Sequence, residues 1–421
     1  MQRSMGLNSE RVGRDNLSSI LRRVHVAGPQ SRSDLAALTG LNRSTIGSLV
    51  QQLAVRRLVE EGRVESTGGP GRPSYMVRAR PDTLLALALD IEVDSLGLAV
   101  VGLGGVPIRT RRIPRVPRAS SPVQTVAQLV EATADLLDAD ALERLVGIGV
   151  AVVGLVRRSD GSVRLAPNLN WRDVPLAEMV RDGLGLRVPV EVGNEADLGG
   201  FAEHLRGAAV GADNVIYLSG EVGLGGGVIV QGRPLIGAGG YAGEIGHMLV
   251  NVDGMRCGCG ADGCWETEVG EAALIRAAGG RAAGPRHRIV NRIVAEAASG
   301  DPSAITAVEH VGRWVGIGLS GLVNAFNPNV IVLGGLFARL YPFIEPVVRA
   351  ELELRATAAA REGLALRPGR YGADGPLYGA AELAFEAILA DPTLVPEIST
   401  RAARRPIAGA GQWTPRPAMP A

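Results

Sequence analysis

The three cysteines constrain the fold of this chain most, because all of them fall in one short stretch that follows a histidine. The segment Glu244-Ile-Gly-His247 precedes Cys257, Cys259 and Cys264, which lie within eight residues of one another. Three thiolates and one imidazole are a typical donor set of a closed, four-coordinate structural zinc site. The grouping predicts one zinc ion per chain, held by His247, Cys257, Cys259 and Cys264. The alternatives are three reduced thiols or a redox-active trio.

Length and composition set the broad class of the protein. The chain has 421 residues, which favours two or three folding units, and 46% of them are hydrophobic, which is ordinary for a soluble protein. No apolar run reaches membrane-spanning length, and residues 1–13 lack the apolar core of a signal peptide. We therefore expect a cytoplasmic protein with no membrane partner.

Charge is distributed unevenly along the chain. Residues 1–80 contain 13 arginines and six acidic residues, a net charge of +7, whereas the remaining residues carry −6. A basic N-terminal part on a mildly acidic body indicates a segment that binds a polyanion such as DNA. A solvated arm without a partner would have the same charge, so the motifs must decide between the two.

The N-terminal part has the pattern of a winged helix-turn-helix domain over residues 14–80. Hydrophobic spacing predicts helices at 15–26, 34–39 (with Ser33 as N-cap) and 42–57, and alternation predicts strands at 58–65 and 74–80. The start of the third helix would enter the major groove of double-stranded DNA, and a wing arginine would reach the minor groove. These DNA-binding candidates are Arg43, Ser44, Thr45, Ser48 and Arg72. The alternative is a small helical domain that binds protein.

The body reads as a two-lobed α/β domain over residues 84–390. The first lobe, 84–213, has the order of one half of an actin-like fold: strands at 84–91, 96–103 and 106–114, a helix at 123–139 and a strand at 146–153. The second lobe, 214–390, begins with a hairpin at 215–231, continues with helices from 268 to 325 and has a short strand at 330–333. Residues 1–13 and 391–421 are expected to be disordered.

The cysteine motif and several further stretches resemble the ROK family of repressors, open reading frames and sugar kinases. The family signature is Glu-x-Gly-His followed by Cys-x-Cys-Gly-x-x-Gly-Cys-x-Glu, and every fixed residue is present here. The resemblance covers residues 15–388, including the winged head that the family's repressors carry and its stand-alone kinases lack. It implies an actin-like (RNase H-like) sugar-kinase-type fold, with a sugar in the interlobe cleft beside the zinc.

The same resemblance implies the residues that contact the sugar. Hydroxyl contacts carry over to Glu244, His247 and Glu266, and Asn168 and Asn194 are further candidates. Glu195 occupies the position where the kinases have an aspartate as general base. Carboxylates accept hydrogen bonds from sugar hydroxyls, and a metal-bound imidazole keeps its other nitrogen available. The alternative for these acids is that they are surface residues in contact with solvent.

The phosphate-binding loops depart from the kinase pattern. The first loop, Asp-x-Gly-Gly-Thr in the family, is Asp90-Ile-Glu92-Val-Asp94 here, and Glu221 replaces the hydroxyl residue of the second loop. Kinases hold triphosphates with backbone N–H groups on glycine turns, and added carboxylates repel phosphate. We therefore expect no catalytic residues and no kinase activity.

The sequence thus predicts a regulator, most simply a repressor of carbohydrate genes, that leaves its operator DNA when a sugar or sugar derivative binds. Palindromic operators favour a symmetric homodimer or homotetramer. The alternatives are an ATP-dependent sugar kinase with an appended DNA-binding domain and a constitutive DNA-binding protein whose body is purely structural.

Overall fold

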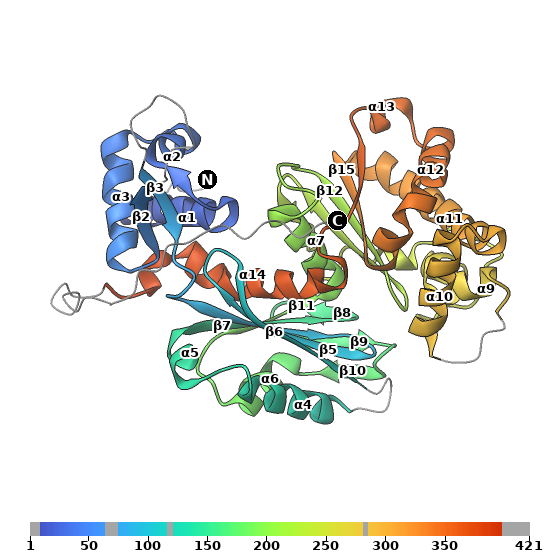
Figure 1. The fold of residues 1–421 in the computed structure, drawn as a ribbon, viewed down its shortest axis with the longest axis horizontal. Coiled ribbons are helices and arrows are strands. Elements are labelled where there is room, and N and C mark those ends of the chain that lie inside the picture. The colour runs from blue at the N-terminus through green and yellow to red at the C-terminus, as the bar shows by residue number, and fades with distance from the viewer. Residues whose placement is uncertain (1–8, 64–74, 116–120, 281–284, 398–421) are drawn as a thin grey trace, which may run out of the picture.

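The computed structural model describes residues 9–63, 75–115, 121–280 and 285–397, which form an N-terminal head and two larger lobes (Figure 1). The head has three helices, and a three-stranded antiparallel sheet in the order β1-β3-β2. Its elements are α1 (Ser9–Ala27), β1 (Gln30–Ser31), α2 (Arg32–Thr39), α3 (Arg43–Val55), β2 (Val59–Arg63) and β3 (Tyr75–Ala79). The three helices and the two longer strands agree with the sequence prediction. The two-residue β1 was missed because it is too short to have a period.

The helix boundaries of the head follow from local capping. The side chain of Ser31 accepts a hydrogen bond from Asp34 N–H at 3.0 Å, and Asp34 in turn accepts from the Ser31 N–H. Ser31, not the expected Ser33, is therefore the N-cap of α2, because only it completes this reciprocal box. Gly40 ends α2 with φ 70°, and Asn42 caps α3. Residues 9–13, expected to be disordered, form the start of α1.

The first lobe is built on a five-stranded sheet in the order β11-β7-β4-β5-β6. Strands β4, β5 and β6 form an antiparallel meander, while β7 and β11 add to it in parallel. The expected helix at 123–139 ends earlier, at Ala134, and Asp138 caps a separate short helix that the sequence analysis did not predict. The elements are β4 (Leu85–Ile91), β5 (Ser95–Gly102), β6 (Val106–Pro114), α4 (Pro122–Ala134), α5 (Ala139–Arg144), β7 (Leu145–Val152), β8 (Leu155–Arg157), β9 (Ser162–Ala166), β10 (Trp171–Val174), α6 (Leu176–Leu184) and β11 (Val190–Asn194), followed by α7 (Glu195–Arg206).

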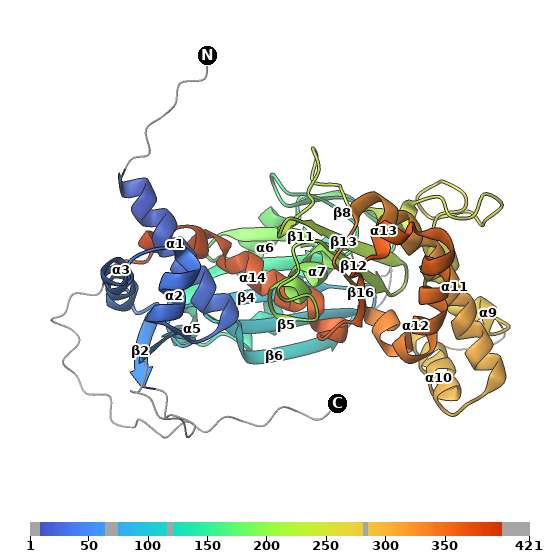
Figure 2. The same cartoon turned by 90° about the horizontal axis from the view of Figure 1, so that it is seen from above.

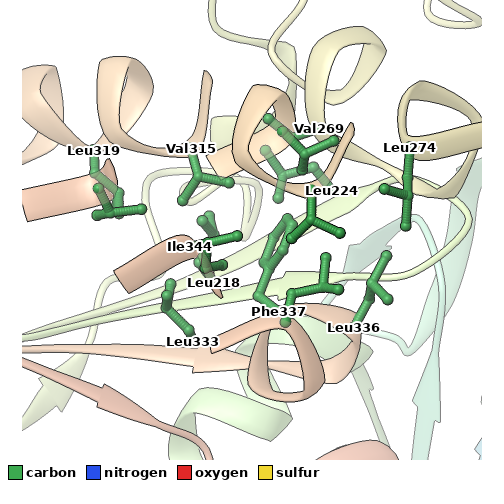
Figure 3. Packing of buried hydrophobic residues seen from close by; sticks show 14 of the residues in the cluster. Leu218, Leu224, Val269, Leu274, Val315, Leu319, Leu333, Leu336, Phe337 and Ile344 are labelled. Carbon is green, nitrogen blue, oxygen red and sulfur yellow. The ribbon is translucent and has the colours of Figure 1, made fainter. Parts of the chain in front are cut away.

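The second lobe repeats this strand order in the sheet β14-β13-β12-β15-β16. Helices cover one side of this sheet and enclose a core of Leu, Val, Ile and Phe side chains (Figure 3). The elements are β12 (Val215–Gly220), β13 (Leu224–Val230), β14 (Arg233–Pro234), η1 (Ile245–His247), α8 (Glu266–Val269), α9 (Glu271–Ala277), α10 (Arg286–Ala298), α11 (Pro302–Phe326), β15 (Val330–Gly334), α12 (Gly335–Arg355), α13 (Ala358–Arg361) and β16 (Ala365–Pro368). Two sheets with one topology are what the predicted actin-like architecture requires.

The last helix, α14 (Gly375–Ala390), returns to the first lobe, although the sequence analysis placed it in the second. Glycines make this packing possible. A Cβ on Gly149 of β7 would lie 1.8 Å from the carbonyl oxygen of Ala380, and one on Gly379 would lie 2.0 Å from that of Leu198 in α7. Backbone therefore meets backbone here, and α14 lies between the first-lobe sheet and α7. Sequence order alone could not reveal this return crossing.

The head is not a loosely tethered unit. Its buried residues, among them Leu21 and Val50, belong to one continuous apolar cluster with Ala88, Phe385 and Ile388 of the first lobe. Figure 2, which views the molecule from above, also shows α1 lying against α14. The connecting segment around Pro81 is also packed, since a Cβ on Gly102 would lie 2.2 Å from the Pro81 carbonyl oxygen. Among the described residues, no helix combines the length and apolarity needed to cross a membrane.

Candidate functional site

The predicted metal ligands lie together at one corner of the second lobe. One donor atom from each of His247, Cys257, Cys259 and Cys264 lies within 4.8 Å of the others. Zinc bonds of about 2.3 Å to sulfur and about 2.0 Å to nitrogen give tetrahedral edges of about 3.5–3.8 Å. The Cys259–Cys264 Sγ separation is 3.6 Å, and Cys257 Sγ lies 3.7 Å from His247 Nδ1. This geometry fits a four-coordinate metal, and the sulfur separation is far too long for a disulfide.

The loop that carries these cysteines is shaped by glycines and anchored by a tryptophan. Gly263 has φ 72°, and a Cβ there would lie 1.8 Å from the Asn251 carbonyl oxygen. Trp265 is fully buried, and its Nε1 donates to the Trp314 carbonyl of α11 at 2.8 Å. Sequence reasoning missed Trp265 as an anchor. The sequence did contain a signal for it, because this large aromatic residue stands directly between Cys264 and Glu266 of the motif.

Two carboxylates, Glu244 and Glu266, lie beside the metal ligands. Cys257 Sγ donates to Glu266 Oε1 at 2.7 Å, and His247 Nε2 lies 4.0 Å from Glu244 Oε2. Burial raises the pKa of Glu244, and the neighbouring Glu266 raises it further, while His247 opposes the shift. Glu244, His247 and Glu266 are thus brought together as the sequence predicted.

Residues from the first lobe, from the start of α7 and from the β12–β13 turn of the second lobe lie beside these carboxylates. Gly223, in the turn between β12 and β13, lies between Glu266 and Asn168: its Cβ would be 2.7 Å from Glu266 Oε2 and 3.9 Å from Asn168 Nδ2. A Cβ on the neighbouring Gly225 would lie 3.3 Å from Glu195 Oε1. Asn168 follows β9 and Glu195 begins α7, so four segments distant in sequence converge here.

Glu195 is the most perturbed carboxyl of this group. Its Oε2 is buried and has no hydrogen-bond partner among the described residues. Burial, together with the charges of Glu244 and Asp197, raises the pKa of Glu195 to about 8. An acid with this pKa is mostly protonated at neutral pH, so it can donate a hydrogen bond.

Asn194 has a structural task that the sequence did not reveal. Its Oδ1 accepts from the backbone N–H groups of Ala196 and Asp197, and its Nδ2 donates to the Gly154 carbonyl at 3.0 Å. The side chain therefore caps α7 and ties it to the first lobe. One amide hydrogen remains for a ligand.

An ion-pair network fills the region of the first phosphate loop. Arg112 of β6 lies 3.6 Å from Asp90, 3.1 Å from Glu92 and 2.9 Å from Asp374. Asp90 is fully buried, and burial and Glu92 raise its pKa well above the ordinary value. Burial and Glu92 likewise raise the pKa of Glu221 to about 8. Carboxyl groups thus gather around the two segments that the sequence analysis compared with the phosphate loops of the kinases.

The DNA-binding candidates of α3 lie on its outer face. Arg43, Ser44 and Ser48 are exposed and Thr45 is half-buried, while Ile46 and Leu49 face the core. The hydroxyl of Ser44 donates to Asn42 Oδ1 at 2.7 Å. Arg72 lies outside the described residues.

Comparison with known proteins places this site in a family. Residues 86–387 match the model of the ROK family. The chain is 29% identical to the xylose repressor of Bacillus subtilis over 90% of this chain and 97% of that protein. A crystal structure of a ROK family transcriptional regulator, a homologue of the E. coli MLC protein, has a TM-score of 0.74 at 26% identity and covers 90% of this chain and 98% of that one.

A kinase structure is similar over a shorter length. The glucokinase of Streptomyces griseus in complex with glucose and AMPPNP has a TM-score of 0.63 at 30% identity, and covers 72% of this chain and 99% of that one. The shared fold is the two-lobed actin-like domain of sugar kinases. The family model spans both lobes, with the cysteine cluster and the candidate site residues between its limits, so this chain belongs to the ROK family.

Proposed function

We propose that this protein is a sugar-responsive transcription regulator, most simply a repressor that leaves its operator when a sugar or sugar derivative binds between the lobes. The observation that carries the proposal is the likeness to a xylose repressor and to a regulator structure over 90% of the chain. The kinase structure matches 72%, and the difference is about the size of the head. The head over residues 14–80 is, in this proposal, a winged helix-turn-helix domain, and residues 84–390 are the sensor.

The head suits duplex DNA through the start of α3. Arg43, Ser44 and Ser48 are exposed on one end of that helix, where a recognition helix presents side chains to base edges. Arg72, in the predicted wing, would add a minor-groove contact. The body would place two heads on a palindromic site as a homodimer or homotetramer.

Replacing Arg43 by alanine is expected to weaken operator binding by about 1–3 kcal/mol and to relax base preference at one position. The measurement is a gel-shift titration with a duplex selected by the wild-type protein from a random pool. Arg109→Ala is the control, since it removes the same charge from the exposed edge of the first lobe. Equal affinity of the Arg43→Ala and Arg109→Ala proteins would refute this placement of the DNA-reading surface.

The sensor site consists of Asn168, Asn194, Glu195, Glu244, His247 and Glu266. His247, Cys257, Cys259 and Cys264 would hold one structural zinc, which fixes the imidazole and keeps Cys257 as a thiolate. A thiolate has no proton to donate to Glu266, so that carboxylate is free to accept from a sugar hydroxyl. Glu195 in its protonated form would donate to the sugar rather than remove a proton from it.

A thermal-shift panel of D-xylose, D-glucose and N-acetyl-D-mannosamine tests the sensor. A ligand bound by the native state alone raises the Tm with concentration. An increase with at least one sugar is the expected result, and that sugar should then weaken operator binding. If none of the three sugars raised the Tm, the result would instead favour a constitutive DNA-binding protein whose body is purely structural.

Sugar kinase activity is the second candidate function, and the carboxyl groups near the phosphate loops oppose it. Glu92 and Glu221 stand at the positions that the sequence comparison matches with the phosphate loops of the kinases, and Arg112 is paired with three acids. We expect no sugar-stimulated release of ADP above background with the same sugars and Mg-ATP. Turnover that is abolished by Glu195→Gln would overturn this expectation.

The raised pKa of Glu195 predicts how stability changes with pH. From its unfolded value of 4.5 up to about 8, the folded protein binds more protons than the unfolded chain, so the unfolding free energy falls as pH rises. Glu195→Gln should therefore be more stable than wild type at pH 8.5, by about 4–5 kcal/mol, with little gain at pH 4.5. Denaturant melts at both pH values measure this. Glu191→Gln, an exposed residue of β11, should match wild type at both.

A further inference from the structure

Helix α7 runs from the candidate sugar site to the head. Its first residue, Glu195, belongs to the candidate sugar site beside Gly225, and its last, Arg206, contacts α1 of the head and α14 of the body. Twelve residues of helix span about 18 Å. In Figure 1, α7 lies beside α14, and the head lies above α14.

Helix α7 is also held tightly by both lobes. A Cβ on Gly199 would lie 2.9 Å from the Tyr217 ring of the second-lobe sheet. Close contact with α14 at Gly379 and the Asn194 bond to Gly154 fix the same helix to the first lobe. A change in the angle between the lobes must therefore displace or strain α7.

The far end of α7 forms a buried polar network with the head. Arg206 Nη1 donates to the carbonyl oxygens of His25 at 2.7 Å and Val26 at 3.1 Å, in the last turn of α1. Arg206 Nε donates to Glu382 Oε1 of α14 at 2.7 Å. A cation at the C-terminal end of a helix satisfies carbonyls that lack an intrahelical partner, so Arg206 caps α1 from another domain.

His25 closes the network. It is fully buried; its Nε2 lies 2.8 Å from Glu382 Oε2, and its Nδ1 accepts from the Gly104 N–H at 2.8 Å. Because Nδ1 is an acceptor, the proton is on Nε2 and points at Glu382. The head, α7, α14 and the β5–β6 turn thus meet through one histidine, one arginine and one glutamate.

The network has room for a second arrangement. A cavity of about 180 Å³ lies beside Arg206 and Glu382 and is lined in part by Tyr371 and Tyr378. Arg206 Nη2 is buried and has no hydrogen-bond partner among the described residues. An unsatisfied buried donor costs free energy, and the adjacent cavity gives the Arg206 side chain space in which to find another partner.

We propose that Arg206, Glu382 and His25 are the coupling joint of the protein: α7 transmits sugar binding in the cleft to the head by shifting Arg206 against the C-terminal end of α1. This assignment rests on the proposed function, because it needs both a sugar in the cleft and DNA on the head. In it Arg206 is a positioning residue that contacts neither ligand. Its exchange should leave each ligand's own affinity in place and remove the effect of one on the other.

The test compares Arg206→Lys, which keeps the charge but not the forked geometry, with Arg22→Ala. Arg22 pairs with Glu386, so this control breaks an α1–α14 contact that does not involve α7. Operator affinity is measured with and without whichever of D-xylose, D-glucose and N-acetyl-D-mannosamine raises the Tm, and sugar affinity with and without the selected duplex. Allosteric coupling is reciprocal, so both ratios must agree.

Wild type and Arg22→Ala should show a ten- to hundredfold loss of operator affinity with sugar. Arg206→Lys should bind sugar alone and operator alone within about threefold of wild type, with a sugar effect below about threefold. A full sugar effect in Arg206→Lys would overturn the joint while leaving the proposed function intact. Loss of both affinities together would assign Arg206 a merely structural role and would also overturn it.

A second measurement needs no variant. In wild type, hydrogen–deuterium exchange of the Gly104 amide and of the last turn of α1 should change on addition of sugar. The Gly104 amide donates to His25, and Arg206 binds the carbonyl oxygens of that last turn, so a shift of Arg206 should alter the protection of both. Unchanged exchange there, with sugar bound and DNA released, would contradict the proposal. If none of the three sugars bound, the proposed sensor function would be contradicted. The coupling joint would then be contradicted as well, because it depends on that function.

Discussion

Replacing Cys257 with alanine is expected to cost about 3 kcal/mol of unfolding free energy and to abolish stoichiometric zinc binding. Cys257 is almost fully buried, and it contacts both His247 and Glu266. Loss of its thiolate would leave an incomplete ligand set and a cavity, and the loop that carries Cys259 would lose its fixed shape. Zinc per chain, measured by mass spectrometry, and the Tm should fall together.

The control for this variant is Arg256→Ala in the same loop. Arg256 makes an exposed ion pair with Asp262 at 3.3 Å, and such pairs contribute about 0–1 kcal/mol. The Arg256→Ala protein should therefore keep its zinc and a Tm close to that of wild type. Wild-type protein purified without chelator and found free of zinc would overturn the assignment of the metal site.

The elements with a strong local pattern were predictable from sequence. The third head helix was expected at 42–57 and runs from Arg43 to Val55, and the meander of β4, β5 and β6 lies within two residues of its predicted bounds. Periodic burial and glycine turns determine these elements locally. The grouping of His247 with the three cysteines was also predictable, because their spacing in sequence is short.

The long-range contacts were not predictable. His25, Arg206 and Glu382 are 176 to 357 residues apart pairwise, and nothing near any of them in sequence indicates its partners. The return of α14 to the first lobe depends on glycines in β7 that also read as ordinary strand residues. Asn194 looked like a ligand residue, while its capping of α7 appears only once the helix start is known. Such tertiary pairing leaves no periodic signal.

The carboxylate of Glu266 should decide whether sugar is sensed. Glu266 begins α8, contacts Cys257 and lies close to Gly223 at the cleft, so one side chain links the metal ligands to the proposed ligand site. Charged hydrogen bonds contribute about 1.5–3 kcal/mol, so Glu266→Ala should weaken sugar binding roughly ten- to hundredfold. Operator binding without sugar should be nearly unchanged, because Glu266 belongs to the second lobe, whereas the head packs against the first lobe and α14.

Two comparisons separate sensing from folding in this variant. Glu309→Ala removes an exposed acid from α11 of the same lobe and should release DNA with sugar as wild type does. Glu266→Gln keeps the shape of the side chain, so it should retain zinc and stability while losing most of the sugar affinity that depends on charge. If Glu266→Ala lost operator binding outright, the wild-type contact between Glu266 and Cys257 would be needed for folding rather than for sensing. If it released DNA normally with sugar, the sugar would have to bind elsewhere than beside the metal ligands.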